Sequence, residues 1–592
     1  MDIVSRLRSV VQEILQENYG LKIDLKDILV NETKPEFPGD YTVVLFSFVK
    51  LAKKSPELLG QELGQLLVQN HAQLFSAFNV IKGFLNLSLT DSALIDFLSV
   101  NAGATDFGRK KNRGEKVMVE YSSPNTNKPL HLGHLRNNFL GWSVAAIYEA
   151  NGYDIIKTCI ANDRGIHICK SMIAWKLFAN GATPELTGIK GDHFVGDYYV
   201  MFSNEYKKQI AELKSKGMSG EQAEKEAPIM KAAQQMLVDW EAGVPEVIDL
   251  WKKMNGWVYE GFDVTYKRIG SDFDKIYYES ETYLLGKDLI EEGLQKNVFF
   301  KKDDGSVWID LTSDGLDQKL VQRKDGTAVY ITQDIGLIVN KFKEFHCERS
   351  IYVVGDEQNY HFKVLKLIAQ KLQLPSADGL YHLSYGMVEL PSGRMKAREG
   401  TVVDADDLID EMVRIAAQHT EELGKVQDFS PDELKTLYDT IGLGALKFYL
   451  LRVDPKKKML FNPEESIDFH GFTGPFVQYS YARIQSILRK EADYKMGGEK
   501  SAELFPLERA VIINLEKFPS VIEQAGLEMN PSVVAIYAFN LAKLYNSFYA
   551  EHSVSRAETE GKKQLRLELS VLTGTVLRSS MALLGIKVPD RM

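Results

Sequence analysis

The stretch of the sequence whose side chains could most readily do chemistry is residues 119–136, VEYSSPNTNKPLHLGHLR. It follows a segment that alternates like a β-strand and leads into a segment with helical spacing. The first backbone N–H groups of a helix favour an anion, and Gly133 lets a flat or phosphate-bearing ligand approach the backbone. His131 and His134 can donate hydrogen bonds to phosphates as charge develops, and Lys128 adds a cation. The stretch therefore predicts a phosphate-binding site.

The segments around this stretch predict a parallel sheet. A strand, a crossover helix and a second strand form the βαβ unit of such sheets, whose ligands bind where the strands end. Helical spacing over 135–150 lies between strand patterns at 116–121 and 153–160. A helix is expected at 166–178, and the alternation resumes as strand 328–332, helix 335–345, strand 351–354 and helix 360–372.

Other parts of the chain have a different character. Residues 1–112 are expected to form an α/β module, with helices over 4–15 and within 41–70 and a strand or hairpin over 80–89. The basic run 108–114 predicts a solvated linker, with an RNA contact as the alternative. The remaining divisions are a sheet domain over 113–404 with an insertion at about 180–325, a helical connector over 405–470 and an all-helical domain over 471–592. In that last domain most of the aromatic residues are expected to be core, with a base-stacking platform as the alternative; they lie in the stripe Tyr537, Leu541, Leu544, Tyr545 and Phe548.

The composition excludes several classes of protein. Of the 592 residues 44% are hydrophobic, which excludes a mainly disordered chain, and the absence of an apolar run of 18 or more predicts no membrane span. Since no secretion signal is evident, a cytoplasmic location is expected. The net charge of −10 argues against a protein that coats nucleic acid, but residues 471–592 hold 15 Lys and Arg against 13 Asp and Glu, about +2. The three cysteines lack zinc-site spacing, and no metal site is predicted.

At residues 131–134, HLGH, the sequence resembles the class I aminoacyl-tRNA synthetases, whose first signature is HIGH. The preceding residues 120–125, EYSSPN, resemble the arginyl-tRNA synthetases in particular. Further stretches similar to that family follow in order over nearly the whole chain: 39–41 (GDY), 83–86 (GFLN), 162–165 (NDRG), 330–334 (YITQD), 353–362 (VVGDEQNYHF), 386–390 (GMVEL), 474–483 (GPFVQYSYAR) and 584–592 (LGIKVPDRM).

This resemblance implies a fold and a reaction. The fold would be multidomain α/β, with a Rossmann-like catalytic domain, an N-terminal domain that contacts tRNA and an α-helical anticodon-binding domain. The reaction would join L-arginine to the 3′ end of tRNA(Arg) through an arginyl-adenylate, with ATP as substrate and Mg²⁺ accompanying it. A monomer is expected. Whether Tyr479, Tyr481, Arg483 and Tyr545 contact tRNA or pack internally stays open.

The resemblance also implies roles for particular residues. The second signature of the class, KMSK, corresponds to 394–400 (RMKAREG), where Ala397 replaces the second lysine. Lys396 and Arg398 remain as cations, and our hypothesis is that Lys128 supplies the missing charge. Tyr330 and Asp334, around the end of the expected strand, match the family's arginine-binding tyrosine and aspartate. The other implied arginine contacts are Glu120, Ser122, Asn125 and Gln358, and the implied ATP contacts are His131, Gly133, His134, Gly355, Met387 and Val388.

Three alternative functions fit the sequence less well. A nucleotidylyltransferase for a small acceptor also uses an HIGH-like string, but such enzymes are usually shorter and lack the helical C-terminal domain. A tRNA-binding protein without catalysis would not need His131, His134 and Lys128. A class I synthetase for another amino acid fits less well with Tyr330, Asp334 and Gln358.

Overall fold

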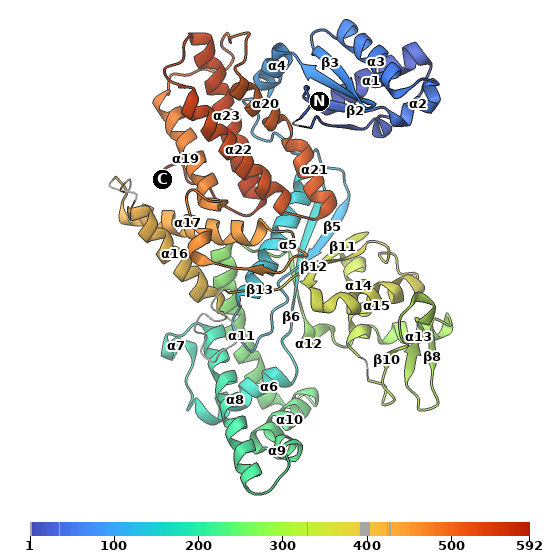
Figure 1. Ribbon diagram of the computed structural model, residues 1–592. Coiled ribbons are helices and arrows are strands. Elements are labelled where there is room, and N and C mark those ends of the chain that lie inside the picture. Colours follow the sequence, from blue (N-terminus) through green and yellow to red (C-terminus); the bar gives the residue numbers. More distant parts are fainter. Residues whose placement is uncertain (1–2, 35, 328, 391–402, 423, 425–427) are drawn as a thin grey trace.

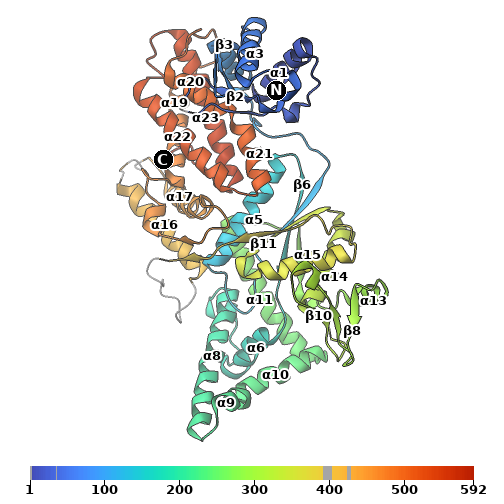
Figure 2. The same ribbon diagram turned by 45° about the vertical axis from the view of Figure 1, so that its right-hand side comes forward.

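The computed structural model describes residues 1–592 except 1–2, 35, 328, 391–402, 423 and 425–427. A central sheet lies in the middle of an elongated molecule (Figure 1). The N-terminal module and the C-terminal helices lie side by side at one end, and a helical excursion forms the other end, as Figure 2 shows from a second direction. In the described part of the chain, no helix has the length and apolar character needed to cross a membrane.

The central sheet has five parallel strands in the order β12-β11-β5-β6-β7. The strand order reverses between β5 and β11, and ligands of doubly wound sheets bind at such a switch point. The expected α/β fold with a parallel sheet is therefore confirmed. The strands are β5 (Lys116–Glu120), β6 (Asp154–Ala161), β7 (Lys275–Tyr278), β11 (Arg349–Gly355) and β12 (Leu380–Tyr385).

Four helices connect and cover these strands: α5 (Leu132–Ala150), α6 (Ile166–Phe178), α14 (Tyr330–Phe345) and α15 (Asn359–Lys371). One expected strand is wrong, because Tyr330, Ile331 and Thr332 form the first turn of α14. Ile331, Ile335 and Ile338 are buried along one face of that helix. The β-branched Val329, Ile331 and Thr332 give residues 328–332 the composition of a strand, but the buried isoleucines have helical spacing.

The excursion from the sheet has two parts, because β7 pairs with β6 from inside the expected insertion. The first part is helical: α7 (Pro184–Thr187), α8 (Gly191–Ser215), α9 (Gly220–Glu226), α10 (Pro228–Glu241) and α11 (Pro245–Ile269). The second part contains α12 (Glu279–Thr282), α13 (Lys287–Gln295) and an antiparallel sheet of β8 (Phe299–Lys301), β9 (Val307–Ile309) and β10 (Lys319–Gln322).

The N-terminal module is an antiparallel sheet, β1-β2-β4-β3, packed with helices. Its β3–β4 hairpin turns at Lys82 and Gly83, both with positive φ, which confirms the expected hairpin. Residues 41–44 form a strand, so the helical expectation is wrong at its start. The elements are α1 (Ile3–Tyr19), β1 (Val30–Glu32), β2 (Tyr41–Val44), α2 (Phe46–Ala52), α3 (Pro56–Asn70), β3 (Phe75–Ile81), β4 (Phe84–Leu89) and α4 (Asp91–Asn101).

In the described residues from 403 onward, the chain forms helices and one strand, β14 (Met459–Leu460), which pairs with β13 (Val388–Glu389). Tyr481, Tyr545 and Phe548 are completely buried there, so these rings serve as core. The helices are α16 (Ala405–Glu422), α17 (Pro431–Leu451), α18 (Pro463–Ser466), α19 (Gly474–Lys490), α20 (Pro506–Glu516), α21 (Phe518–Glu528), α22 (Ser532–Glu551) and α23 (Glu560–Leu583).

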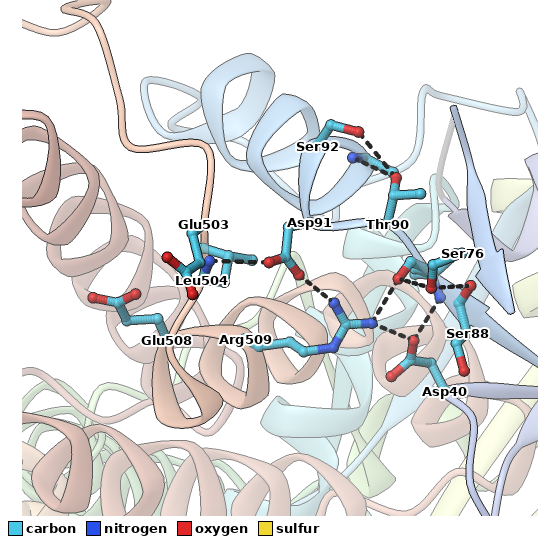
Figure 3. Close-up of polar contacts among 12 residues, drawn as sticks. Asp40, Ser76, Ser88, Thr90, Asp91, Ser92, Glu503, Leu504, Glu508 and Arg509 are labelled. Carbon is cyan, nitrogen blue, oxygen red and sulfur yellow. Dashed lines mark hydrogen bonds and ion pairs between the residues drawn. The ribbon is translucent and has the colours of Figure 1, made fainter. Parts of the chain in front are cut away.

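Arg509 on α20 joins the N-terminal module to the C-terminal helices (Figure 3). Its Nη2 lies 2.6 Å from Oδ2 of Asp40, and its Nη1 lies 2.7 Å from Oδ1 of Asp91. The same carboxylates accept the backbone N–H groups of Leu89 and Leu504 at 2.7 and 3.0 Å. Asp40 belongs to the GDY stretch, which therefore has a docking role in this structure.

The variant Arg509→Ala is expected to weaken this docking by about 2 kcal/mol, because it leaves two partly buried carboxylates without their cation. Amide hydrogen exchange at Leu89 and Leu504 measures the change, and should become about 30-fold faster. The control is Lys517→Ala at the same interface, since Lys517 pairs with a Glu32 side chain that is 61% exposed and should contribute little. Equal exchange rates in both variants would contradict the docking role.

Candidate active site

The site begins at the loop between β5 and α5, which has an uncommon backbone. Ser122 and Ser123 have φ values of 78° and 47°, the left-handed region that residues other than glycine seldom adopt. Their cost in strain is offset by bonds in the interior: the N–H of Ser122 donates to Oδ1 of Asn137 at 2.5 Å, and its Oγ lies 2.6 Å from the hydroxyl of Tyr266. The loop then returns so that Asn125 pairs with Asn162, which follows β6.

The two signature histidines cap α5 in a reciprocal arrangement. The N–H of Gly133 donates to Nδ1 of His131 at 3.1 Å, and the N–H of His131 donates to Nδ1 of His134 at 3.2 Å. Their ring centroids lie 3.8 Å apart. Since each Nδ1 accepts a hydrogen bond, the proton of each neutral ring lies on Nε2. Both rings thus present an N–H donor, as phosphate binding requires.

The charge state of the histidines follows from burial. Burial, with a smaller contribution from the charge of Lys128, lowers the pKa of His131 to about 4. Burial and the neighbouring His131 lower the pKa of His134 well below its usual value, and burial lowers the pKa of Lys128. At neutral pH the pair is therefore uncharged beside a lysine whose charge is poorly solvated. An anion placed here would relieve that cost.

A cavity of about 810 Å³ opens beside these elements. Of the expected arginine contacts, Asn125, Tyr330 and Asp334 line it. Tyr330 and Asp334 lie one helical turn apart in the first turns of α14, so they face the same side. Oδ2 of Asp334 lies 2.6 Å from Nε2 of His361, and the Tyr330 side of the helix is open, with that residue 73% exposed.

The sequence indicates no role for several ionisable residues that line the cavity or contact its aspartate, among them Arg164, Glu279 and His361. Arg164 lies 3.1 Å from a carboxylate oxygen of Glu241 and 4.0 Å from the ring centroid of Tyr283. Burial raises the pKa of Glu279, with the charge of Arg164 opposing it. The family-like string NDRG contains Arg164, but nothing in the sequence indicates its partners on α10 and after α12.

Other expected contacts do not line this cavity. Glu120 is buried at the end of β5 and forms an ion pair with the equally buried Lys341. Ser122 is 3% exposed, and its Oγ is bonded to Tyr266 and Asn138. Gln358 is exposed on the short helix that follows β11. These positions make Glu120 and Ser122 supports of the loop in this structure rather than contacts within the cavity.

The expected ATP contacts gather at the switch point, beside the cavity rather than within it. Gly133 lies in the first turn of α5, and Gly355 ends β11. Met387 and Val388 follow β12, and Arg136 of α5 donates to the carbonyl oxygen of Gly386 at 2.6 Å. The signature helix is thereby tied to the segment after β12. Lys396 and Arg398 lie outside the described residues.

Comparisons with known proteins agree with this arrangement. The family model described as tRNA synthetases class I (R), catalytic domain, matches residues 98–462. The arginyl tRNA synthetase N terminal domain matches residues 5–89, and the DALR anticodon binding domain matches residues 477–592.

Relatives match over the whole chain. An arginine–tRNA ligase of Bacteroides thetaiotaomicron is 52% identical, and one of Amoebophilus asiaticus is 50% identical, each over 100% of both chains. The fold is similar to that of Thermus thermophilus arginyl-tRNA synthetase, with a TM-score of 0.79 and 24% identity over 100% of both chains. The arginyl-tRNA synthetase of Plasmodium falciparum gives 0.77 and 18% over 100% of this chain and 99% of the other. The chain therefore belongs to the arginyl-tRNA synthetases of class I.

Proposed function

We propose that this protein joins L-arginine to the 3′ end of tRNA(Arg) in two steps. In the first step the carboxylate of arginine attacks the α-phosphorus of ATP, which gives arginyl-adenylate and pyrophosphate. In the second step a terminal ribose hydroxyl of the tRNA takes the arginyl group, and AMP leaves. The observation that carries this proposal is the full-length match to arginine–tRNA ligases at about half identity.

The geometry supports the first step. In-line attack on phosphorus depends on positioning and on stabilising the developing charge rather than on a protein nucleophile. The Nε2–H groups of His131 and His134 and the start of α5 would contact the phosphates, with Lys128 beside them. Mg²⁺ would arrive with ATP, held by phosphate oxygens and water, which needs no dedicated cage of protein ligands.

The cavity supports binding of arginine. A guanidinium is planar and permanently charged, so it requires a carboxylate and favours an aromatic face. Asp334 would supply the carboxylate and Tyr330 the ring, while Asn125 would hold the α-amino or carboxylate end. Glu241 and Glu279 also line the cavity, together with the basic side chains of Arg164, Lys287 and Arg323. Lysine would satisfy a carboxylate less well, and citrulline would leave it without a cation.

The remaining partners follow from the domains. Residues 471–592 would bind the anticodon, and residues 1–112 would contact another part of the tRNA. Arg483 lies between the rings of Tyr479 and Tyr549, at 5.0 and 5.5 Å, on a partly exposed face of α19 and α22. We also infer a monomer that acts in the cytoplasm.

Charging of tRNA tests the proposal directly. Purified protein, ATP and labelled arginine should give labelled tRNA(Arg), and periodate-oxidised tRNA, which lacks the terminal diol, should stay unlabelled. Labelling of the oxidised tRNA at the same rate, or of intact tRNA with another amino acid only, would refute the proposed reaction.

The variant Lys128→Ala is expected to lower kcat/KM for ATP in arginine-dependent pyrophosphate exchange at least about tenfold, because a cation would be lost beside the phosphates. The matched control is Lys170→Ala. Lys170 is also a lysine whose pKa is lowered by burial, but it lies over the ring of Phe202. Nearly normal exchange in Lys128→Ala would show that Lys128 does not compensate for Ala397.

A further inference from the structure

Six polar side chains join the two ends of the helical excursion to the start of α16. Nζ of Lys190, just before α8, lies 3.0 Å from Oδ2 of Asp192 and 2.7 Å from Oδ2 of Asp406. Nε2 of His193 lies 3.0 Å from the same oxygen of Asp406. Thr265 on α11 donates to Oδ1 of Asp406 at 3.0 Å. We call this set the Asp406 cluster: Lys190, Asp192, His193, Thr265, Asp404 and Asp406.

The cluster is largely buried. The Asp192 side chain is fully buried, and those of Asp404, Asp406, Lys190 and His193 are 16 to 29% exposed. Two glycines let α8 and α11 approach: a Cβ on Gly191 would lie 2.0 Å from the carbonyl oxygen of Trp257, and one on Gly261 would lie 2.4 Å from Oδ1 of Asp192. The two helices that hold Asp406 are therefore packed closely against each other.

Main-chain hydrogen bonds connect the cluster to the signature histidine. The N–H of Leu132 donates to the carbonyl oxygen of Val403 at 3.0 Å, and the N–H of Ala405 donates to that of Leu130 at 3.0 Å. His131 thus lies opposite Asp404 in an antiparallel bridge. The carboxylate of Asp404 accepts the N–H groups of Asp406 and Asp407, which fixes the turn into α16. After this bridge, Asp406 is the first residue whose side chain is bonded to both α8 and α11.

Within the cluster, the charges of Asp406 and His193 stabilise each other. Burial alone would raise the pKa of Asp406, but hydrogen bonds from His193 and Lys190 lower it below its usual range. Burial would lower the pKa of His193, but Asp406, Asp404 and Asp192 together raise it despite the charge of Lys190. Asp192, His193 and Asp406 carry the kinds of atoms that bind metals. The ammonium group of Lys190, however, already lies between the carboxylates of Asp192 and Asp406, where a metal ion would have to bind.

We infer that Asp406 is a positioning residue for adenylate formation, which holds residues 403–405 against the signature so that Nε2 of His131 keeps its direction toward the phosphates of ATP. Asp406 lies behind the bridge and acts through His131. The inference rests on the proposed role of His131. The helical excursion would then contribute to the reaction in the sheet domain, because α8 and α11 supply the groups that hold Asp406.

The variant Asp406→Asn tests this in the full-length protein by arginine-dependent ATP–pyrophosphate exchange with tRNA present. We expect kcat to fall at least about tenfold, while the apparent KM for arginine changes less than twofold. The matched control is Asp410→Asn, one turn further along α16. Asp410 pairs with Arg268 of the same α11 at 2.6 Å, but its side chain is 68% exposed and it does not touch the bridge. The control should stay within twofold of the unmodified protein.

A double-mutant cycle with His131→Asn separates positioning from general destabilisation. If Asp406 acts through His131, Asp406→Asn should cost less than twofold in the His131→Asn background. A further tenfold loss there would overturn the inference while leaving the role of His131 intact. Normal activity of His131→Asn alone would refute that role and the inference with it. If Asp406→Asn fails to fold, Thr265→Val takes its place, because it removes one hydrogen bond to Asp406. We then expect kcat to fall about two- to fivefold when His131 is present, and the same cycle with His131→Asn tests whether that loss depends on His131.

Discussion

The variant His131→Asn should lower kcat of arginine-dependent ATP–pyrophosphate exchange by about 10²- to 10³-fold, the usual cost of losing one pre-positioned hydrogen-bond donor to a developing charge. His131 has two functions in the structure. Its Nδ1 caps α5 by accepting the N–H of Gly133, and its Nε2–H would contact the phosphates. Asparagine is a good helix cap but is too short to replace Nε2.

The variant His131→Asn should therefore lose activity while its stability stays nearly unchanged. His131→Asn should unfold within a few degrees of the unmodified protein, whereas His131→Ala should lose about 1 kcal/mol of stability along with the activity. Because the pKa of His131 is about 4, its protonation should not limit exchange between pH 6 and 8. Unchanged exchange in His131→Asn, with the cap preserved, would show that the ring does not serve the phosphates.

The second large effect is expected at the guanidinium. Asp334→Asn removes a carboxylate charge that a buried arginine side chain would need, so the apparent KM for arginine should rise about 10- to 100-fold, the range expected for one charged hydrogen bond. The KM for ATP should change little. Steady-state exchange at varied arginine and fixed ATP measures both values.

His361 provides a control for this prediction. Its Nε2 lies 2.6 Å from Oδ2 of Asp334, so a guanidinium would use Oδ1. His361→Gln preserves a donor to Asp334 and should raise the KM for arginine less than about fivefold, because the carboxylate keeps its charge. An arginine KM in Asp334→Asn no higher than in His361→Gln would exclude Asp334 from the guanidinium role.

The centre of the fold could be predicted from the sequence, whereas the edges of the sheet could not. Strands β5, β6 and β11 and helices α5, α6 and α15 have the periodicity of buried elements, and they lie close to the expected ranges. The two strands that were not predicted, β7 and β12, are the two edges of the sheet. β7 has only four residues, too few for a pattern to be recognised, and the apolar residues of β12 are interrupted by His382 and Ser384. Tyr330 was placed near a strand end because its β-branched neighbours fit both elements.

The same division applies to the site. The signature histidines could be found because their partners are local: each Nδ1 is bonded within three residues. By contrast, Glu120 and Lys341 are 221 residues apart, and Asp334 and His361 are 27 residues apart. Their pairing depends on which strands and helices become neighbours, which periodicity does not specify. Arg164 was in a recognised string, but its contacts with Glu241 and Tyr283 come from the folded excursion.

The measurement that tests the central claim most directly is ATP–pyrophosphate exchange with each of the twenty amino acids, with and without tRNA. We expect exchange with arginine and with no other amino acid, and the family resemblance implies that this exchange requires tRNA. Exchange with a different amino acid would mean that the cavity around Asp334 does not select a guanidinium. No exchange in any combination would contradict adenylate formation at the switch point between β5 and β11.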